Sequence, residues 1–127
     1  MGFFNFSKSK ATKAVLPWEQ VTSVEQINEI LRNVGETPVL LFKHSTRCSI
    51  SSMALNGFER NWNNEVDCKL YFIDLLKHRD VSNEIATLTG VIHQSPQCIV
   101  VKGSEIVYDA THTAIDAKRI ESILKKS

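Results

Sequence analysis

Four short apolar segments, separated by polar stretches, dominate the hydrophobic pattern of the chain. They cover residues 39–42, 70–75, 97–101 and 105–108, and each has the length of a β-strand. Compact apolar runs of this length are typical of strands buried on both faces of a sheet. The last two runs are separated only by residues 102–104, which include a glycine. This short connection predicts an antiparallel hairpin.

Apolar residues at helical spacing predict one helix before the first strand and another after it. The first helix begins at Ser23, and Gln26 stands three positions later, as in a capping box. We expect this helix to end at Gly35, because glycine commonly terminates helices. The second helix is predicted from apolar residues at four-residue steps. These residues are Ile50, Ala54, Phe58 and Trp62.

Two further helices are predicted nearer the C-terminus. Asp80 can cap a short helix that Gly90 closes. Thr113, with Asp116 three positions later, is the predicted start of the last helix. The elements therefore run helix, strand, helix, strand, helix, strand, strand, helix, with residues 17–21 as a candidate edge strand in front.

This order of elements predicts an α/β fold. Strands separated by helices are most simply parallel neighbours joined by crossovers, and the hairpin adds antiparallel strands. We therefore expect a central mixed sheet of four to five strands with helices on both faces. The length of 127 residues suits one domain, which we place at residues 17–127. Residues 1–16, a small apolar patch and a Lys/Ser/Ala stretch, are predicted to be a flexible N-terminal tail.

Composition and charge exclude several classes of protein. The hydrophobic fraction of 43% and the charged fraction of 23% match a soluble globular protein. The formal net charge of +1 lacks the basic excess of a dedicated nucleic-acid binder. No apolar run approaches the roughly 20 residues that span a bilayer, so we expect no membrane partner. The three cysteines are odd in number and far apart in sequence, which favours free thiols in a reducing cytoplasm.

Cys48 stands where the predicted fold would place a reactive thiol. It follows a buried strand and lies in the first turn of a helix, where free N–H groups and the helix dipole favour a thiolate. A helix terminus contributes only about 0.3–1 kcal/mol, so other groups must help. Ser51 can donate its hydroxyl to the sulfur, and Arg47 adds a nearby positive charge. We therefore predict that Cys48 is the reactive cysteine of the chain.

The step Ser95-Pro96, near the start of the third strand, is the second candidate feature. The preference of an X-Pro bond for the trans form is only about 0.5–1 kcal/mol, and we expect this bond to be cis. A cis bond would expose the Ser95 backbone to an extended partner. We expect Pro96 within van der Waals reach of the Cys48 sulfur, and His93 could line the same groove.

Other interpretations of the histidines and cysteines remain open. His44, four positions before Cys48, could pair with a thiolate there or be an ordinary loop residue. A zinc site at these two residues needs two more ligands that the sequence does not group, so we expect no metal. Cys68 could be a resolving thiol or a structural one, and Cys98 is expected to pack in the core.

The layout of strand, Cys-x-x-Ser, helix, strand, helix, X-Pro, hairpin and helix resembles the thioredoxin superfamily over about residues 18–125. Within it, residues 46–51 and 93–97 are similar to the Thr-x-Cys-x-x-Ser and Ser-Pro-Gln segments of the monothiol bacilliredoxin (YtxJ) family. The resemblance implies a thioredoxin-like fold and a thiol–disulfide oxidoreductase that removes bacillithiol from protein mixed disulfides. It also implies bacillithiol as thiol co-substrate, S-thiolated client proteins as partners and no bound cofactor. It places Cys48 and Ser51 in catalysis and Thr46, Arg47, His93, Ser95 and Pro96 in substrate binding.

Departures from related families narrow the expected activity. The motif has no second cysteine, so dithiol reduction of the thioredoxin type is not available through it. The glutaredoxin Cys-Gly-Phe-Ser motif is absent, and residues 110–113 stand in place of the glutaredoxin Gly-Gly loop. Two alternatives remain. One is a glutathione- or coenzyme-A-linked monothiol reductase on the same scaffold, and the other is a non-catalytic docking or redox-sensing domain.

Overall fold

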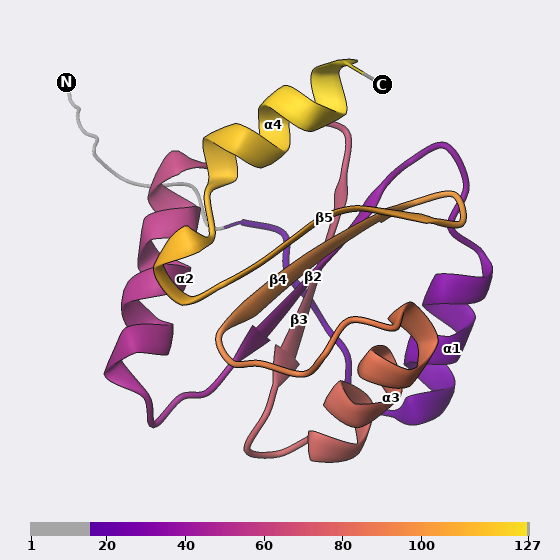
Figure 1. Ribbon diagram of the computed structural model, residues 1–127, viewed down its shortest axis with the longest axis vertical. Helices are drawn as coiled ribbons and strands as arrows, with labels where there is room; N and C mark the ends of the chain where they lie inside the picture. Colours follow the sequence, from indigo (N-terminus) through magenta and orange to yellow (C-terminus); the bar gives the residue numbers. More distant parts are fainter. Residues whose placement is uncertain (1–15, 127) are drawn as a thin grey trace, which may run out of the picture.

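The computed structural model describes residues 16–126, which form one five-stranded mixed sheet with α-helices on both faces (Figure 1). The predicted α/β fold and its mixed sheet are confirmed. Of the tail predicted for residues 1–16, only Leu16 is described, and it is buried. In chain order the elements are β1 (Glu19–Gln20), α1 (Val24–Arg32), β2 (Val39–His44), α2 (Ser49–Asn61), β3 (Lys69–Asp74), α3 (Arg79–Thr89), β4 (Gln97–Lys102), β5 (Glu105–Thr111), the 3₁₀ helix η2 (His112–Ala114) and α4 (Ala117–Lys126).

The strand order β1-β3-β2-β4-β5 places β2 at the centre of the sheet. β3 is parallel to β1 and β2, whereas β4 is antiparallel to β2 and β5. Lys43, near the end of β2, lies opposite Gln97, the first residue of β4. The segment that follows β2 and the segment that precedes β4 therefore meet at the same end of the sheet.

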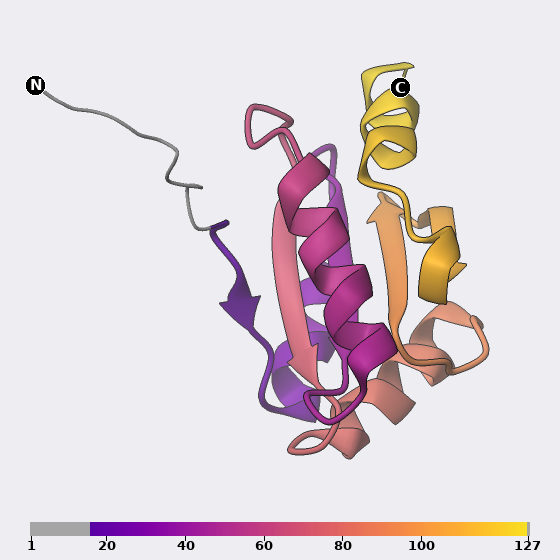
Figure 2. The ribbon, with the colours of Figure 1, turned by 90° about the vertical axis from the view of Figure 1, so that its left-hand side faces the viewer.

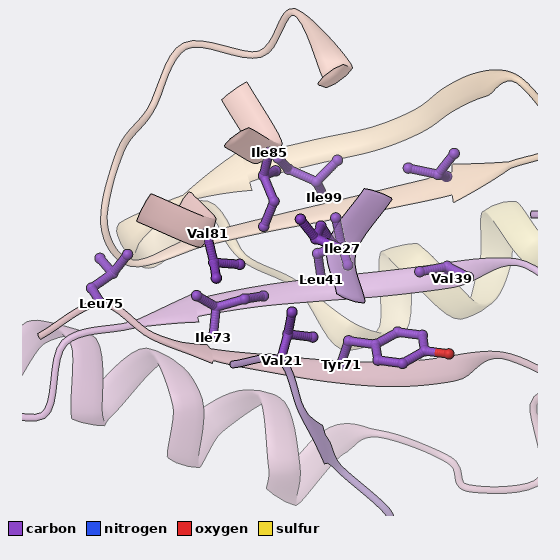
Figure 3. Packing of buried hydrophobic residues seen from close by; sticks show 11 residues of the cluster. Val21, Ile27, Val39, Leu41, Tyr71, Ile73, Leu75, Val81, Ile85 and Ile99 are labelled. Carbon is purple, nitrogen blue, oxygen red and sulfur yellow. The ribbon is translucent and has the colours of Figure 1, made fainter. Parts of the chain in front are cut away.

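Alternate residues of β2 build two separate cores, because successive side chains of a strand point to opposite faces. Val39 and Leu41 pack with residues of α1 and α3, as Figure 3 shows. Leu40 and Phe42 pack with residues of α2 and α4 on the other face. Figure 2 shows α2 lying along this second face, with β1 at one edge of the sheet. Every residue of β2 is buried, as expected for a central strand.

The capping box predicted for α1 is confirmed, but the predicted end of this helix is wrong. The Ser23 hydroxyl accepts the N–H of Gln26 at 3.0 Å. The C-cap is Asn33 and not Gly35, because the N–H of Asn33 already bonds two carbonyls of the preceding turn. The helix therefore stops two residues earlier than the glycine suggests.

The predicted starts of the two later helices also need correction. His78 is the N-cap of α3, and Asp80 lies inside its first turn. The predicted end of α3 at Gly90 is confirmed, with a φ of 75° at the glycine. Thr113 belongs to η2. The Asp116 carboxylate accepts two backbone N–H groups in the first turn of α4, at 3.0 and 3.2 Å. Asp116 therefore caps the last helix.

Candidate active site

Cys48 lies at the end of the turn that joins β2 to α2. It is the N-cap residue of α2, and its side chain makes no capping hydrogen bond. Its N–H donates to the Ser45 carbonyl at 3.1 Å, and its carbonyl accepts the N–H of Ser52 at 3.0 Å. The side chain is half-buried, so its sulfur combines a helix N-terminus with access to solvent. The dipole and free amides of that terminus favour negative charge on the sulfur.

Ser51 ties the first turn of α2 to the end of β2. Its side chain is fully buried. The hydroxyl oxygen accepts the N–H of Ser45 at 3.0 Å and lies 2.7 Å from Nδ1 of His44. Within residues 16–126 no hydrogen bond joins this hydroxyl to the Cys48 sulfur, in contrast to the predicted donation. Ser51 therefore contacts the frame of the turn that carries the thiol.

His44 is the buried partner of Ser51. Its ring packs against Phe72, with the ring centroids 5.5 Å apart. Burial lowers the pKa of His44, although Asp74, Glu59 and the bond to Ser51 act in the opposite direction. The ring is therefore neutral at neutral pH, with a proton on one nitrogen only. Because Nδ1 faces Ser51, the structure shows this contact in place of the Cys48–His44 ion pair that the sequence left open.

Thr46 and Arg47 form the exposed part of the turn before Cys48. In the described part of the chain, neither side chain has a hydrogen-bond or salt-bridge partner. The Arg47 guanidinium is thus available to an anionic group that approaches the thiol. Both residues are therefore exposed next to Cys48, and their predicted role in substrate binding stays a prediction.

The Ser95-Pro96 peptide bond is cis, as predicted. Pro96 is buried, and its carbonyl accepts the N–H of His112 at 3.0 Å. The Ser95 hydroxyl is buried and has no hydrogen-bond partner among the described residues. Gln97 lies opposite Lys43 in the antiparallel pair. Pro96, one residue before Gln97, therefore lies at the level where β2 ends. This segment and the Cys48 turn therefore share one end of the sheet, and contact between Pro96 and the sulfur stays a prediction.

His93 precedes the cis-proline segment and points toward the interior. Its Nδ1 lies 2.8 Å from the Ser82 hydroxyl of α3 and 3.3 Å from Nζ of Lys43 on β2. Lys43 is fully buried. Sequence reasoning missed these two partners, although a lysine directly after the apolar run 39–42 was a visible signal.

An apolar groove of about 370 Å³ lies between α2 and η2. Ile50 and Met53 of α2 line it and are 48% and 71% exposed. The apolar pattern predicted for α2 is therefore divided, since Phe58 and Trp62 pack in the core and Ile50 faces this groove. Its remaining lining residues are Ala54, Gly57, His112, Thr113 and Ile115.

The other two thiols have environments unlike that of Cys48. Burial raises the pKa of Cys68 to about 12, and Asp67 acts in the same direction. Burial also raises the pKa of Cys98, which is fully buried as predicted. Both side chains are thus held as neutral thiols at neutral pH. Neither forms a disulfide in this structure.

Within residues 16–126 no three His, Cys, Asp or Glu side chains come together in a way that could hold a metal ion. No helix of this range is long and apolar enough to cross a membrane.

A helix-terminal cysteine and a cis-proline segment at the same end of a mixed sheet of this order define the class of thioredoxin-fold thiol–disulfide oxidoreductases. A protein described as a candidate oxidoreductase with a thioredoxin fold is 27% identical, with a TM-score of 0.71 over 84% of this chain and 92% of its own. The model of the monothiol bacilliredoxin BrxC family matches residues 19–120, and the chain belongs to that family.

Two thioredoxins share the fold at lower sequence identity. Thioredoxin from Trypanosoma brucei brucei is 13% identical, with a TM-score of 0.65 over 94% of this chain and 96% of its own. Thioredoxin f from spinach chloroplast is 19% identical, with a TM-score of 0.63 over 87% of each chain. At such identities the similarity shows the fold alone.

Proposed function

We propose that this oxidoreductase removes bacillithiol from mixed disulfides on client proteins, with Cys48 as the nucleophile. One observation carries the proposal: a half-buried thiol at a helix N-terminus is followed, three positions later, by Ser51. A serine cannot form a disulfide, so exchange at this site proceeds through one thiol. Membership of the monothiol bacilliredoxin family supports bacillithiol as the small thiol.

The reaction consists of two thiol–disulfide exchanges. In the first, the Cys48 thiolate attacks the bacillithiol sulfur of the mixed disulfide. The bond between the two sulfurs of the mixed disulfide breaks, the client leaves as a thiolate, and Cys48 becomes disulfide-bonded to bacillithiol. In the second, the thiolate of another bacillithiol attacks the bacillithiol sulfur of this adduct. The products are bacillithiol disulfide and the free Cys48 thiolate, so the electrons come from the small thiol without a bound cofactor.

The neighbouring residues have distinct roles in this proposal. Ser51 holds the turn of Cys48 through His44 and the Ser45 N–H. Thr46 and Arg47 contact the incoming substrate at the exposed rim.

The cis-proline segment completes the proposed substrate groove. The Ser95 backbone binds the extended client segment beside Pro96. His93 supports the cis-proline segment through its contact with the Ser82 hydroxyl. We place the reaction in a reducing cytoplasm, which the odd number of cysteines supports.

Intact-mass measurement tests the proposal. The reduced protein is mixed with oxidised bacillithiol and, in parallel, with oxidised glutathione. We expect one bacillithiol adduct on Cys48 that forms faster than the glutathione adduct, and no adduct in Cys48→Ser. Equal rates for the two disulfides would show that bacillithiol is not the preferred thiol. An adduct that persists in Cys48→Ser would exclude Cys48 as the nucleophile.

A further inference from the structure

Lys43 is a charged side chain enclosed in the interior of the fold. It lies near the end of β2, between Ile73 of β3 and Gln97 of β4 in the sheet register, and its exposed fraction is 0%. Within residues 16–126 no carboxylate pairs with it. Burial of an unpaired ammonium carries a large desolvation penalty. The burial lowers the pKa of Lys43 to about 8, so the side chain is mostly charged at neutral pH.

The contacts of Lys43 join three separate parts of the chain. Its Nζ lies 3.2 Å from the Ser82 carbonyl oxygen of α3 and 3.3 Å from Nδ1 of His93. The Ser82 hydroxyl approaches the same Nδ1 at 2.8 Å. The imidazole of His93 thus contacts both β2 and α3, and it belongs to the segment that leads to the cis proline.

The hydrogen-bonding properties of these groups determine which ring nitrogen of His93 carries the proton. An ammonium group only donates hydrogen bonds, so a hydrogen bond from Lys43 requires the tautomer in which Nδ1 accepts. We therefore assign the proton of the neutral ring to Nε2. Burial, together with the positive charges of Lys43 and Arg79, lowers the pKa of His93 and keeps the ring neutral.

His93 belongs to a segment without regular secondary structure, residues 90–96, that ends at the cis proline. Besides the contacts of His93, two side-chain hydrogen bonds among the described residues reach this segment. Thr89 Oγ1 accepts the N–H of Val91 at 3.2 Å, and Gln97 Nε2 donates to the Ile92 carbonyl at 2.9 Å. We propose that Lys43, with Ser82 and His93, positions the Ser95-Pro96 segment for the exchange reaction at Cys48. The proposal rests on the proposed function and assigns Lys43 as a positioning residue for it.

A positioning role predicts that a substitution at Lys43 affects stability and activity differently. Methionine has a similar length and no charge to bury, so Lys43→Met should retain or increase stability. The same change removes one donor to Nδ1 and loosens the substrate segment. Lys43 and His44 point to opposite faces of β2, so the contact between His44 and Ser51 stays intact. The substitution should therefore slow the removal of bacillithiol from a protein and leave the reactivity of Cys48 toward a small reagent unchanged.

The experiment compares Lys43→Met, His93→Asn and His93→Gln with the wild type. A model protein S-thiolated with bacillithiol is the substrate, and iodoacetamide probes Cys48 directly. We expect Lys43→Met to lower kcat/KM about tenfold, as for one lost hydrogen bond to a charged group. Asparagine can present its amide oxygen at the place of Nδ1, so His93→Asn should retain most of the activity. His93→Gln displaces the acceptor and should match Lys43→Met.

Each outcome separates the positioning role from the function itself. Wild-type activity in Lys43→Met and His93→Gln would overturn the positioning role and leave the proposed function intact. Equal losses in alkylation and in dethiolation would also overturn it, because Lys43 would then act on the thiol. The ¹⁵N shifts of His93 in the wild type test the contact even if the protein removes no bacillithiol. A protonated Nδ1 would contradict the proposal.

Discussion

Nδ1 of His44 lies 2.7 Å from the hydroxyl oxygen of Ser51, across the turn that ends at Cys48. The same oxygen accepts the N–H of Ser45 at 3.0 Å. His44 is the last residue of β2, and Ser51 is in the first turn of α2. One hydroxyl thus closes the turn on two sides. Ser51 therefore has a structural role that does not depend on any contact with sulfur.

Substitution of Ser51 by alanine should destabilise the protein by about 1–3 kcal/mol, since it leaves a buried ring nitrogen and a backbone N–H without a partner. Urea unfolding measures the change in the free energy of unfolding. Ser52→Ala is the matched control, because Ser52 lies next in α2 and its side chain has no hydrogen-bond partner among the described residues. We expect an effect within about 0.5 kcal/mol for this control. Equal effects of the two substitutions would contradict the role of Ser51.

Cys48 should react with iodoacetamide before the other two cysteines at neutral pH. Cys98 is fully buried, and burial raises the pKa of Cys68 to about 12. The thiolate is the reacting form, so Cys68 should gain reactivity only toward strongly alkaline pH. Mass spectrometry of the labelled peptides measures each rate, and protein unfolded in urea is the control in which the three rates converge. Equal rates at Cys48 and Cys68 in the folded protein would contradict the assignment.

The fold could be predicted from the sequence because its signals are local. The apolar run 39–42 marks the central strand, and the glycine-containing connection at 102–104 marks the hairpin. Helix ends were less accurate, since neighbouring residues compete for the same cap. Asn33 ends α1 before Gly35. Asp116, and not the predicted Thr113, caps the N-terminus of α4.

The candidate site could be predicted only where its residues share a motif. The spacing of Cys48 and Ser51, and the X-Pro step at Pro96, are visible in the sequence. The contacts of Lys43 join it to Ser82 and His93, which are 39 and 50 positions away. Such contacts depend on how α3 packs against β2, and no periodicity in the sequence encodes this distance. For the same reason the inward direction of Ser51 became visible only in the fold.

Gly90→Ala should destabilise the protein by about 1 kcal/mol. Gly90 ends α3 with a φ of 75°, and residues with a Cβ atom are strained in that region. A Cβ atom at this position would meet no other atom within 4 Å, so the cost is one of backbone conformation. Gly35→Ala is the control, because Gly35 has equal space and no positive φ. Thermal or urea unfolding distinguishes the two, and equal stabilities would contradict the argument.

The stability contributed by Lys43 should depend on pH. Burial lowers its pKa from 10.5 to about 8 in the folded protein. Between these values the unfolded chain binds a proton that the folded chain does not, so the free energy of unfolding rises with pH. Below about pH 8 both states are protonated, and this contribution is constant.

Lys43→Met is the reference that isolates this effect, because the other titrating groups are common to both proteins. The free energy of unfolding of the wild type, minus that of Lys43→Met, should increase from about pH 8 to about pH 10. Urea unfolding at several pH values measures the difference. A difference that is flat or falls over this range would mean that Lys43 keeps an ordinary pKa in the folded state.

A cysteine at position 51 should convert the one-thiol reaction into a two-thiol reaction. In the wild type, the bacillithiol adduct on Cys48 should persist until free bacillithiol is added, because Ser51 cannot displace it. In Ser51→Cys the new thiol attacks Cys48 within the same molecule, at a high effective concentration. That variant should release bacillithiol and form an internal disulfide, as intact mass under non-reducing conditions would show. The double variant Cys48→Ser with Ser51→Cys should form none. A wild-type protein that passes directly to a disulfide with Cys68 or Cys98 would contradict the monothiol mechanism.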